Sequence, residues 1–350
     1  MSENRGARRL AIIAALVGAV VGGLAAGAAA AEPMVATTQL GWVRNGEFAP
    51  ILVAEAKGFF KDAGIEHHII DDGPGKNPIP IVAVGQAEFG ISTSALYLIA
   101  ARAARDPVDV VAIGTNFQIT PSSYIRLATP GTPEPTPKDL LGKAIGVQAN
   151  TEFLLRALAV KNGLDPAALK FVTVQANAEP LMVGQVDFFL GWITNQTYQI
   201  EQEAAKPDAP PSLKGKTWQA LRFSQWSMPS YADVIFTTGA TLKAKPELVK
   251  AYLRAVARGM QAILDDPAGT IELTAHFPGQ IEDTAKLAWR WPKQGPLFTG
   301  TETAQHGLLW MSPEIWEQMV DLMKNGDQIP SRLPVGELMT DAFLPGPLAK

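Results

Sequence analysis

The sequence predicts an α/β fold in two lobes, each a mostly parallel sheet flanked by helices. Short apolar strands alternate with amphipathic helices over the first two thirds of the chain, a pattern typical of a parallel sheet covered on both faces. At 350 residues the chain exceeds one comfortable core, which favours two domains. In addition, VGQAEFGIS at 84–92 and VGQVDFFLG at 183–191 are identical at four positions and share an acidic residue at a fifth, which indicates that one structural unit is built twice.

The first 31 residues have the layout of a secretory signal peptide. Arg5, Arg8 and Arg9 precede an apolar run from Leu10 that ends in alanines up to Ala31. A membrane anchor is the alternative, but the apolar core is short and no stop-transfer charges follow it. The chain has no cysteine, which excludes disulfides, thiolate metal sites and a lipid-bearing cysteine. We therefore expect a periplasmic protein, exported with cleavage of residues 1–31 and not anchored by lipid.

The elements of the first predicted sheet follow one another closely. A strand at 35–40 leads into a helix that Pro50 can begin and Gly58 can end, because proline suits the first helical position and glycine tolerates positive φ. The later elements follow from the same patterns: strands at 65–70, 89–92 and 108–114, with helices at 79–84 and 95–104.

A proline-rich segment at 129–137 predicts a stiff surface loop near a lobe boundary. Beyond it we expect strands at 144–147, 171–174 and 186–192 and a helix at 151–162 that Gly163 ends. From Pro229 the pattern becomes mainly helical, with one strand at 233–237 and helices at 246–264, 267–275, 281–290 and 313–323.

Candidate ligand-binding residues follow from this order of elements. Trp42, Asn45 and Phe48 lie just ahead of a helix N-terminus, where unpaired N–H groups attract electron-rich atoms. Ligands of open α/β sheets bind at the carboxyl ends of strands, which adds Ser92, Thr93 and Trp192. The remaining candidates offer hydrogen-bonding groups at strand ends, loops or helix starts: Gln118, Glu152, Asn195 and Tyr231.

Each of these residues has an alternative interpretation. Core packing would equally explain Trp42 and Trp192, and a first-turn glutamate such as Glu152 can simply favour the helix dipole. Glu88 and Asp187 belong to the repeated turn, so we expect structural roles for both.

Composition argues against several functions. The formal net charge is −4 and basic runs are absent from the sequence, so nucleic acid is not an expected partner. The adjacent His67 and His68 fall on a predicted strand and would face opposite sides, so they do not form a metal site together. The sequence contains none of the common hydrolase, zinc-protease, dinucleotide or phosphate-loop motifs. We therefore predict no catalytic residues, no metal and no cofactor.

Six segments occur in the order found in one known family. They are GWVRNGEFAPILVAEAKGFFKDAGI, VAVGQAEFGIS, DLLGKAIGV, MVGQVDFFLGW, MPSYADVIFTT and PELVKAYLRAVARGMQAILDDP, and together they span about 36 to 270. This set resembles the periplasmic substrate-binding proteins of ABC importers for nitrate, sulfonates, taurine and thiamine-pyrimidine precursors, whose fold is shared by a fungal pyrimidine synthase.

The resemblance implies a type II periplasmic binding protein with two crossover strands. One lobe would hold 34–122 plus 229–350, the other 123–228, and they would close on a small molecule. It also implies a partner, the permease of an ABC transporter in the inner membrane.

The resemblance leaves the ligand open. The pyrimidine-binding branch usually has histidine where this chain has Phe48, which cannot form the same hydrogen bond. The two tryptophans and the shortage of arginines favour a small planar nitrogen heterocycle such as a thiamine-pyrimidine precursor. A sulfonate, taurine or nitrate-like anion is the alternative, and an enzyme resembling the pyrimidine synthase is a third possibility, although the fungal cysteine-rich segment is absent.

Overall fold

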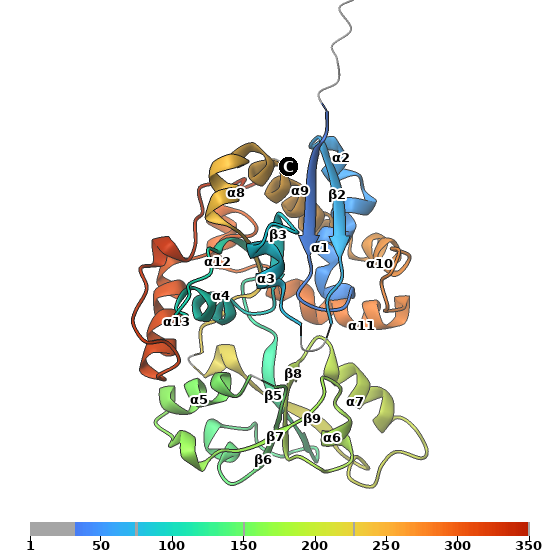
Figure 1. Cartoon of the computed structure of the whole chain (residues 1–350). Helices are drawn as coiled ribbons and strands as arrows, with labels where there is room; N and C mark the ends of the chain where they lie inside the picture. Colours follow the sequence, from blue (N-terminus) through green and yellow to red (C-terminus); the bar gives the residue numbers. More distant parts are fainter. Residues whose placement is uncertain (1–31, 74–75, 150, 227, 349–350) are drawn as a thin grey trace, which may run out of the picture. The chain divides into compact units, whose positions relative to one another are not determined.

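The computed structural model describes residues 32–73, 76–149, 151–226 and 228–348. The predicted signal peptide at 1–31 lies outside these residues. Among the helices that are described, none is both long and apolar enough to cross a membrane. From Met34 onward the chain forms two five-stranded sheets with helices packed around them (Figure 1).

The first sheet has the strand order β2-β1-β3-β10-β4. Its parallel pairs are β1 with β2 and β1 with β3, whereas β10 runs antiparallel to both β3 and β4. Its strands are β1 (Met34–Gln39), β2 (Ile65–Ile70), β3 (Phe89–Ser92), β4 (Val111–Phe117) and β10 (Ala232–Thr237).

The second sheet repeats this topology in the order β7-β6-β8-β5-β9. Here β6 pairs in parallel with β7 and β8, and β5 runs antiparallel to β8 and β9. Its strands are β5 (Ser122–Ala128), β6 (Ala144–Val147), β7 (Lys170–Thr173), β8 (Phe188–Trp192) and β9 (Thr217–Arg222). We call the part built on the first sheet the first half and the part built on the second sheet the second half.

The antiparallel strand of each sheet is the one that enters from the other half. The chain passes from β4 to β5 through residues 118–121 and returns from β9 to β10 through residues 223–231. The α/β class and the two-sheet organisation are confirmed, although the sheets are mixed. The sequence did not predict β5 and β9, and the proline-rich segment at 129–137 connects β5 to β6 instead of linking the halves.

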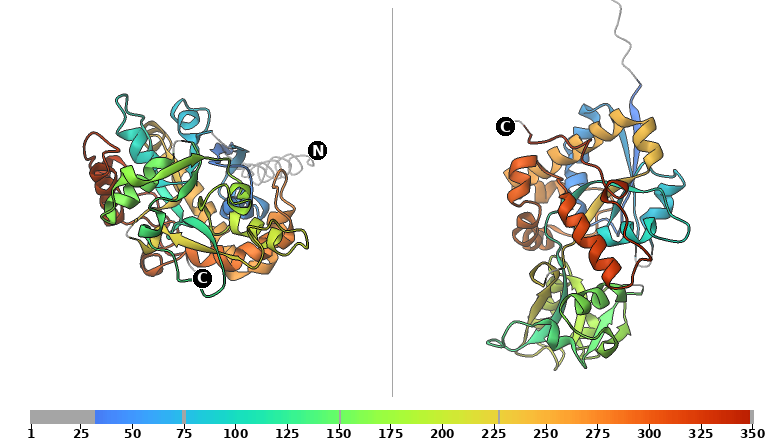
Figure 2. Two further views of the ribbon diagram at one scale, coloured as in Figure 1. Left: turned by 90° about the horizontal axis from the view of Figure 1, so that it is seen from below. Right: turned by 90° about the vertical axis from the view of Figure 1, so that its left-hand side faces the viewer.

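Helices cover both sheets, and the C-terminal helices pack mainly on the first half, although the helix at 313–325 also contacts the helix at 152–161 of the second half (Figures 1 and 2). Those formed before β9 are α1 (Ala49–Ala56), α2 (Phe59–Asp62), α3 (Pro78–Ala83), α4 (Ala95–Arg102), α5 (Glu152–Lys161), α6 (Glu179–Met182) and α7 (Gln196–Ala204). Those after β10 are α8 (Gly239–Ala244), α9 (Pro246–Asp265), α10 (Pro267–Ala275), α11 (Thr284–Gln294), α12 (Thr301–His306) and α13 (Pro313–Asn325).

The amphipathic helix α9 packs its apolar face closely on α1. A Cβ atom at Gly259 would lie 2.0 Å from the carbonyl oxygen of Pro50, so only glycine permits this approach. Leu253, Val256 and Met260 are buried in the same core as Leu52 of α1. This packing holds the N-terminus of α1, and the loop that precedes it, against the body of the first half.

The repeated sequence unit forms the same structure twice. Gly85 and Gly184 have φ of +75° and +77°, and each lies ahead of a strand, β3 or β8. The Glu88 Oε2 atom accepts a hydrogen bond from the Thr37 N–H at 2.9 Å. The Asp187 Oδ2 atom accepts one from the Ala144 N–H, also at 2.9 Å. Asp187 therefore holds the first residue of β6 and Glu88 holds the middle of β1, and both acids have the structural role that the sequence predicts.

Candidate functional site

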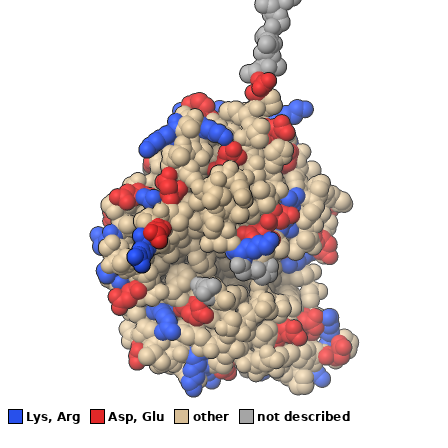
Figure 3. Space-filling model, in the orientation of Figure 1, with Lys and Arg blue, Asp and Glu red and all other residues tan. Residues whose placement is uncertain are grey.

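A cleft of about 530 Å³ lies between the two halves at the ends of β3 and β8. Its mouth is the hollow in the middle of the face shown in Figure 3, where acidic and basic side chains are interspersed. The first half lines the cleft with Gly41, Trp42, Glu47, Lys76, Asn77, Pro78, Ser92, Thr93, Ser94, Tyr97 and Ala100. The second half lines it with Ser122, the first residue of β5, and with Gln148, Ala149, Thr151, Phe153, Leu154, Ala176, Leu190, Gly191, Trp192, Asn195 and Gln196.

The loop between β1 and α1 forms the floor of the cleft on the first half. Asn45 caps a short 3₁₀ helix at Gly46–Phe48, and its Oδ1 atom accepts a hydrogen bond from the Glu47 N–H at 2.7 Å. The Asn45 Nδ2 group in turn donates to Glu47 Oε2 at 3.2 Å. The first bond fixes the backbone of Glu47 and the second orients its side chain, and the residue is only 3 % exposed yet lines the cleft.

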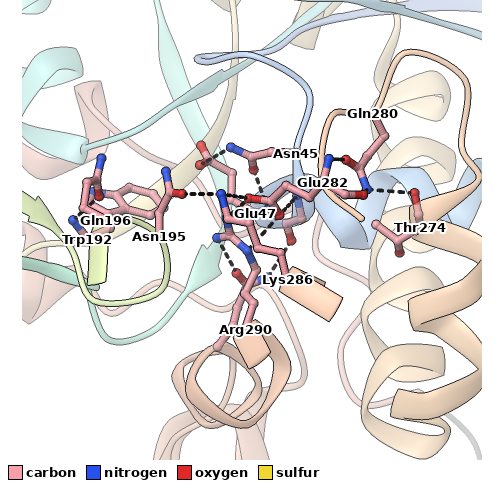
Figure 4. A network of polar contacts seen from close by, with 12 residues as sticks. Asn45, Glu47, Trp192, Asn195, Gln196, Thr274, Gln280, Glu282, Lys286 and Arg290 are labelled. Atoms are coloured by element: carbon pink, nitrogen blue, oxygen red, sulfur yellow. Dashed lines mark hydrogen bonds and ion pairs between the residues drawn. The ribbon is translucent and has the colours of Figure 1, made fainter. Parts of the chain in front are cut away.

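A buried ion pair between Arg290 of α11 and Glu282, which precedes this helix, supports the loop (Figure 4). The Arg290 guanidinium is fully buried and donates to both carboxylate oxygens of Glu282, with Nε 3.0 Å from Oε2. Glu282 Oε2 also accepts the Gly46 N–H at 3.0 Å, and Gln294 Nε2 donates to the Gly46 carbonyl at 2.8 Å. A Cβ atom at Gly46 would lie 2.5 Å from a terminal methyl of Leu287, so any other residue at this position would force that side chain or the loop to shift.

The carboxyl groups around this ion pair differ in protonation. Burial raises the pKa of Glu47 to about 7, and the Arg290 charge only partly offsets this. Burial also raises the pKa of Asp233 well above its usual range; this strand residue has a φ of +49°. For Glu282, burial acts in the same direction, but Arg290 and Lys286 outweigh it and lower the pKa. Glu282 is therefore the ionised partner of Arg290.

The second half places Trp192 and Asn195 at the end of β8. The Trp192 N–H donates to Gln196 Oε1 at 2.8 Å, and Gln196 Nε2 donates to the Ala176 carbonyl at 3.1 Å. The Asn195 Oδ1 atom accepts a hydrogen bond from Lys286 Nζ of the first half at 3.0 Å. Since Lys286 also pairs with Glu282 at 2.7 Å, this polar network extends from the second half to the floor of the cleft (Figure 4).

Aromatic side chains from the two halves also meet at the cleft. Tyr97 of α4 and Phe153 of α5 pack edge to face with ring centroids 5.8 Å apart. Trp192 packs edge to face on Phe117 of β4, with centroids 5.6 Å apart. Trp42 is half-buried at the opposite wall. The cleft therefore offers aromatic surface from both halves.

Five of the ten residues predicted for the site line this cleft: Trp42, Ser92, Thr93, Trp192 and Asn195. The other five lie elsewhere. Phe48 is fully buried in the core of the first half, and Asn45 acts through Glu47. Gln118 Nε2 donates to the Trp310 carbonyl at 2.8 Å, and the Tyr231 hydroxyl accepts the Ser312 N–H at 2.8 Å.

Glu152 is the last of the five predicted residues that do not line the cleft. It is the first residue of α5, and its neighbours Thr151 and Phe153 do line the cleft.

Sequence reasoning missed Glu47, Tyr97 and Phe153. Tyr97 and Phe153 fall among apolar residues of helices, where core packing explains them equally well. Glu47 had a recognisable signal, since it lies two residues after Asn45 in the loop that was singled out.

Comparison with known proteins gives relatives over most of the chain. The chain is 26% identical over 314 residues to the 4-amino-5-hydroxymethyl-2-methylpyrimidine phosphate synthase of Legionella pneumophila, covering 88% of this chain and 92% of that protein. It is 25% identical over 322 residues to the riboflavin-binding protein RibY of Chloroflexus aurantiacus, covering 89% and 86% of the two chains.

Solved structures share the fold. The periplasmic aliphatic sulphonate binding protein SsuA of Escherichia coli superposes with a TM-score of 0.65 at 14% identity, over 91% of this chain and 94% of SsuA. The predicted periplasmic binding protein fold is therefore confirmed. The model of the family described as NMT1/THI5 like matches residues 45–270, which include the floor of the cleft, both sheet crossovers and α9. The chain belongs to the NMT1/THI5-like family.

Proposed function

We propose that this protein is the periplasmic solute-binding component of an ABC importer, and that it captures a small planar nitrogen heterocycle between its halves. A thiamine-pyrimidine precursor is the type of ligand we expect. The closed, loaded protein would then deliver this ligand to a permease in the inner membrane. The signal-peptide layout of residues 1–31 supports export, and the absence of cysteine from the sequence supports a protein that is not lipid-anchored.

One observation carries the choice of ligand class. Trp42, Tyr97, Phe153 and Trp192 line the cleft from both halves, and among the described lining residues there is no arginine. Flat aromatic surfaces stabilise a flat ligand by stacking, and the polar groups between them can fix its orientation. The volume of about 530 Å³ falls within the range of small-molecule pockets. Two relatives are named for a pyrimidine product and for riboflavin, both of which contain planar nitrogen heterocycles.

A compact anion such as a sulfonate, taurine or nitrate is the second candidate. The shared fold with the sulphonate-binding SsuA favours it. Lys76 lines the cleft and is exposed, so one cation is available near the mouth. The buried Glu47 carboxyl at the floor opposes an anion there, because like charges repel strongly in a site that excludes water.

Catalysis is the third candidate, because the Legionella relative is named a synthase. In our proposal the protein forms no bond. The cysteine-rich segment of the fungal enzymes has no counterpart in a chain without cysteine.

Calorimetric titration with 4-amino-5-hydroxymethyl-2-methylpyrimidine, riboflavin, taurine and nitrate tests the proposal. We expect a heterocycle to bind, and Trp42→Ala and Trp192→Ala each to weaken it at least tenfold, since each removes a stacking surface. Trp310→Ala is the matched control, because that tryptophan stacks on His306 and does not line the cleft. Binding of taurine or nitrate alone would contradict the proposed ligand, and turnover of any heterocycle by the purified protein would contradict a purely binding role.

A further inference from the structure

The Glu47 carboxyl has one oxygen free at the floor of the cleft. Its Oε2 atom accepts the Asn45 Nδ2 hydrogen bond at 3.2 Å, whereas Oε1 is buried and has no hydrogen-bond partner among the described residues. Leaving a buried acceptor unpaired costs about 1–3 kcal/mol. Because the residue lines the cleft, a ligand donor that bonded to this oxygen would offset that cost.

The cations near Glu47 do not pair with it. Arg290 of α11 donates to Glu282 and, from Nη1, to Gln294 Oε1 at 3.3 Å. Lys286, one turn away, contacts Glu282 at 2.7 Å and Asn195 at 3.0 Å. The Glu282 charge also acts on Glu47 through space and raises its pKa, and Glu47 in turn raises the pKa of the buried Asp233 of β10. The Glu47 carboxyl is therefore not committed to any cation of the described chain.

A free carboxyl oxygen distinguishes between the ligand classes considered above. As a carboxylate it accepts hydrogen bonds and donates none, so it matches an amino group or ring N–H. A sulfonate or nitrate presents only acceptor oxygens and would face this group with like charge. On the basis of the proposed function, we infer that Glu47 is the specificity-determining residue of the cleft. Its Oε1 atom accepts a hydrogen bond from an N–H group on the edge of the bound heterocycle. The same atom disfavours ligands that present only acceptors.

The inference carries a pH signature. Burial raises the pKa of Glu47 to about 7, so the free protein holds a mixture of acid and carboxylate near neutrality. A ligand N–H binds the carboxylate better, so binding releases a proton and affinity rises as pH increases through about 7. An anion would prefer the neutral acid, and its affinity would fall over the same range.

Titration calorimetry of the full mature chain tests this, with 4-amino-5-hydroxymethyl-2-methylpyrimidine and riboflavin as probes at pH 6 and pH 8. A hydrogen bond to a charged group predicts a roughly 10- to 100-fold loss of heterocycle affinity in Glu47→Ala. Glu47→Gln keeps an acceptor but does not titrate, so we expect a smaller loss and no rise in affinity between pH 6 and pH 8. Ser122→Ala, which alters another polar group of the cleft, should keep that rise.

Two outcomes would overturn the inference, and they are distinguishable. If the wild type binds a heterocycle and Glu47→Ala binds it equally well, the role of Glu47 is wrong and the proposed function stands. If the wild type binds only nitrate or an alkanesulfonate that carries no amino group, the proposed function fails and the inference fails with it. Thermal unfolding of both variants separates loss of binding from loss of fold, and the pH dependence of the Glu47→Gln variant decides the case if Glu47→Ala does not fold.

Discussion

The two halves repeat one topology but contribute different chemistry to the cleft. In each, a glycine with positive φ, an acid that holds the neighbouring strand and a buried strand bring a strand end to the cleft. On β3 that end carries the small polar Ser92 and Thr93, whereas on β8 it carries Gly191 and Trp192. The scaffold is thus repeated while the ligand-facing residues have diverged.

The larger difference lies behind the surface of the cleft. The first half contains the buried Glu282–Arg290 pair and the buried Glu47 and Asp233 carboxyls. In the described part of the second half, the ion pair between its own residues is the surface pair Glu203–Lys206. Since buried charges demand fixed partners, the first half forms a rigid floor, and the second half contributes a more adaptable aromatic and amide wall.

The largest expected effect tests the rigid floor. Arg290→Met removes one partner of a fully buried ion pair and leaves Glu282 with Lys286 as its remaining cation, so we expect the free energy of unfolding to fall by about 3 kcal/mol. Urea unfolding measures this. Lys206→Met, which removes the surface pair of the second half, should leave the midpoint unchanged. Equal effects of the two substitutions would break the contrast between the halves.

Most of the fold could be predicted because its signals are local. The strands β2, β3 and β6 have exactly the predicted limits, and Pro50 and Gly58 mark the ends of α1 as expected. The strands β5 and β9 were missed because both mix polar and apolar residues without clear alternation, SSYIRLA and TWQALR. Their place is decided by pairing with each other and with β8, which no local pattern encodes.

The site was less predictable because its floor depends on distant contacts. The loop at Gly46 is held by Glu282, Arg290 and Gln294, more than two hundred positions along the chain. Propensity and periodicity do not reveal such pairs. The rule that ligands bind at the carboxyl ends of strands named Ser92, Thr93 and Trp192, and all three line the cleft. The expectation that ligands bind at a helix N-terminus named Phe48, which is buried in the core.

A smaller effect compares the two repeated turns. Glu88 accepts the Thr37 N–H and also pairs with Lys245 Nζ at 3.0 Å, whereas the side chain of the exposed Asp187 bonds, among the residues that the structure describes, to the Ala144 N–H alone. We expect Glu88→Ala to lower the free energy of unfolding by about 1 kcal/mol and Asp187→Ala by less. Urea unfolding at pH 7 measures both, and a larger loss in Asp187→Ala would reverse the proposed order of rigidity.

The pH dependence of stability isolates another group of the first half. Burial lowers the pKa of His67, and the nearby Glu55 only partly opposes this. Below the ordinary pKa of 6.5 the imidazole takes up a proton in the unfolded chain, whereas burial resists this protonation in the folded chain. The free energy of unfolding therefore falls as the pH decreases below 6.5. The slope is at most about 1.4 kcal/mol per pH unit.

His67→Gln should flatten this decline in unfolding experiments between pH 7 and pH 5. His68→Gln is the matched control, because that neighbouring side chain is 53% exposed and faces the other side of the strand. An unchanged slope in His67→Gln would mean that another group governs the acid sensitivity of this half.

The smallest expected effect concerns a contact between the halves outside the cleft. Glu201 of α7 accepts hydrogen bonds from Trp289 Nε1 of α11 at 2.6 Å and from Trp218 Nε1 of β9 at 2.9 Å. Because Glu201 touches no part of the floor, Glu201→Ala should weaken heterocycle binding only two- to fivefold, or about 0.4–1 kcal/mol, by removing one closing contact. Glu203→Ala on the same helix, which affects only the surface pair with Lys206, should leave affinity unchanged. A loss as large as that of Trp192→Ala would mean that closure, and not the aromatic wall, is the main contribution of the second half to binding.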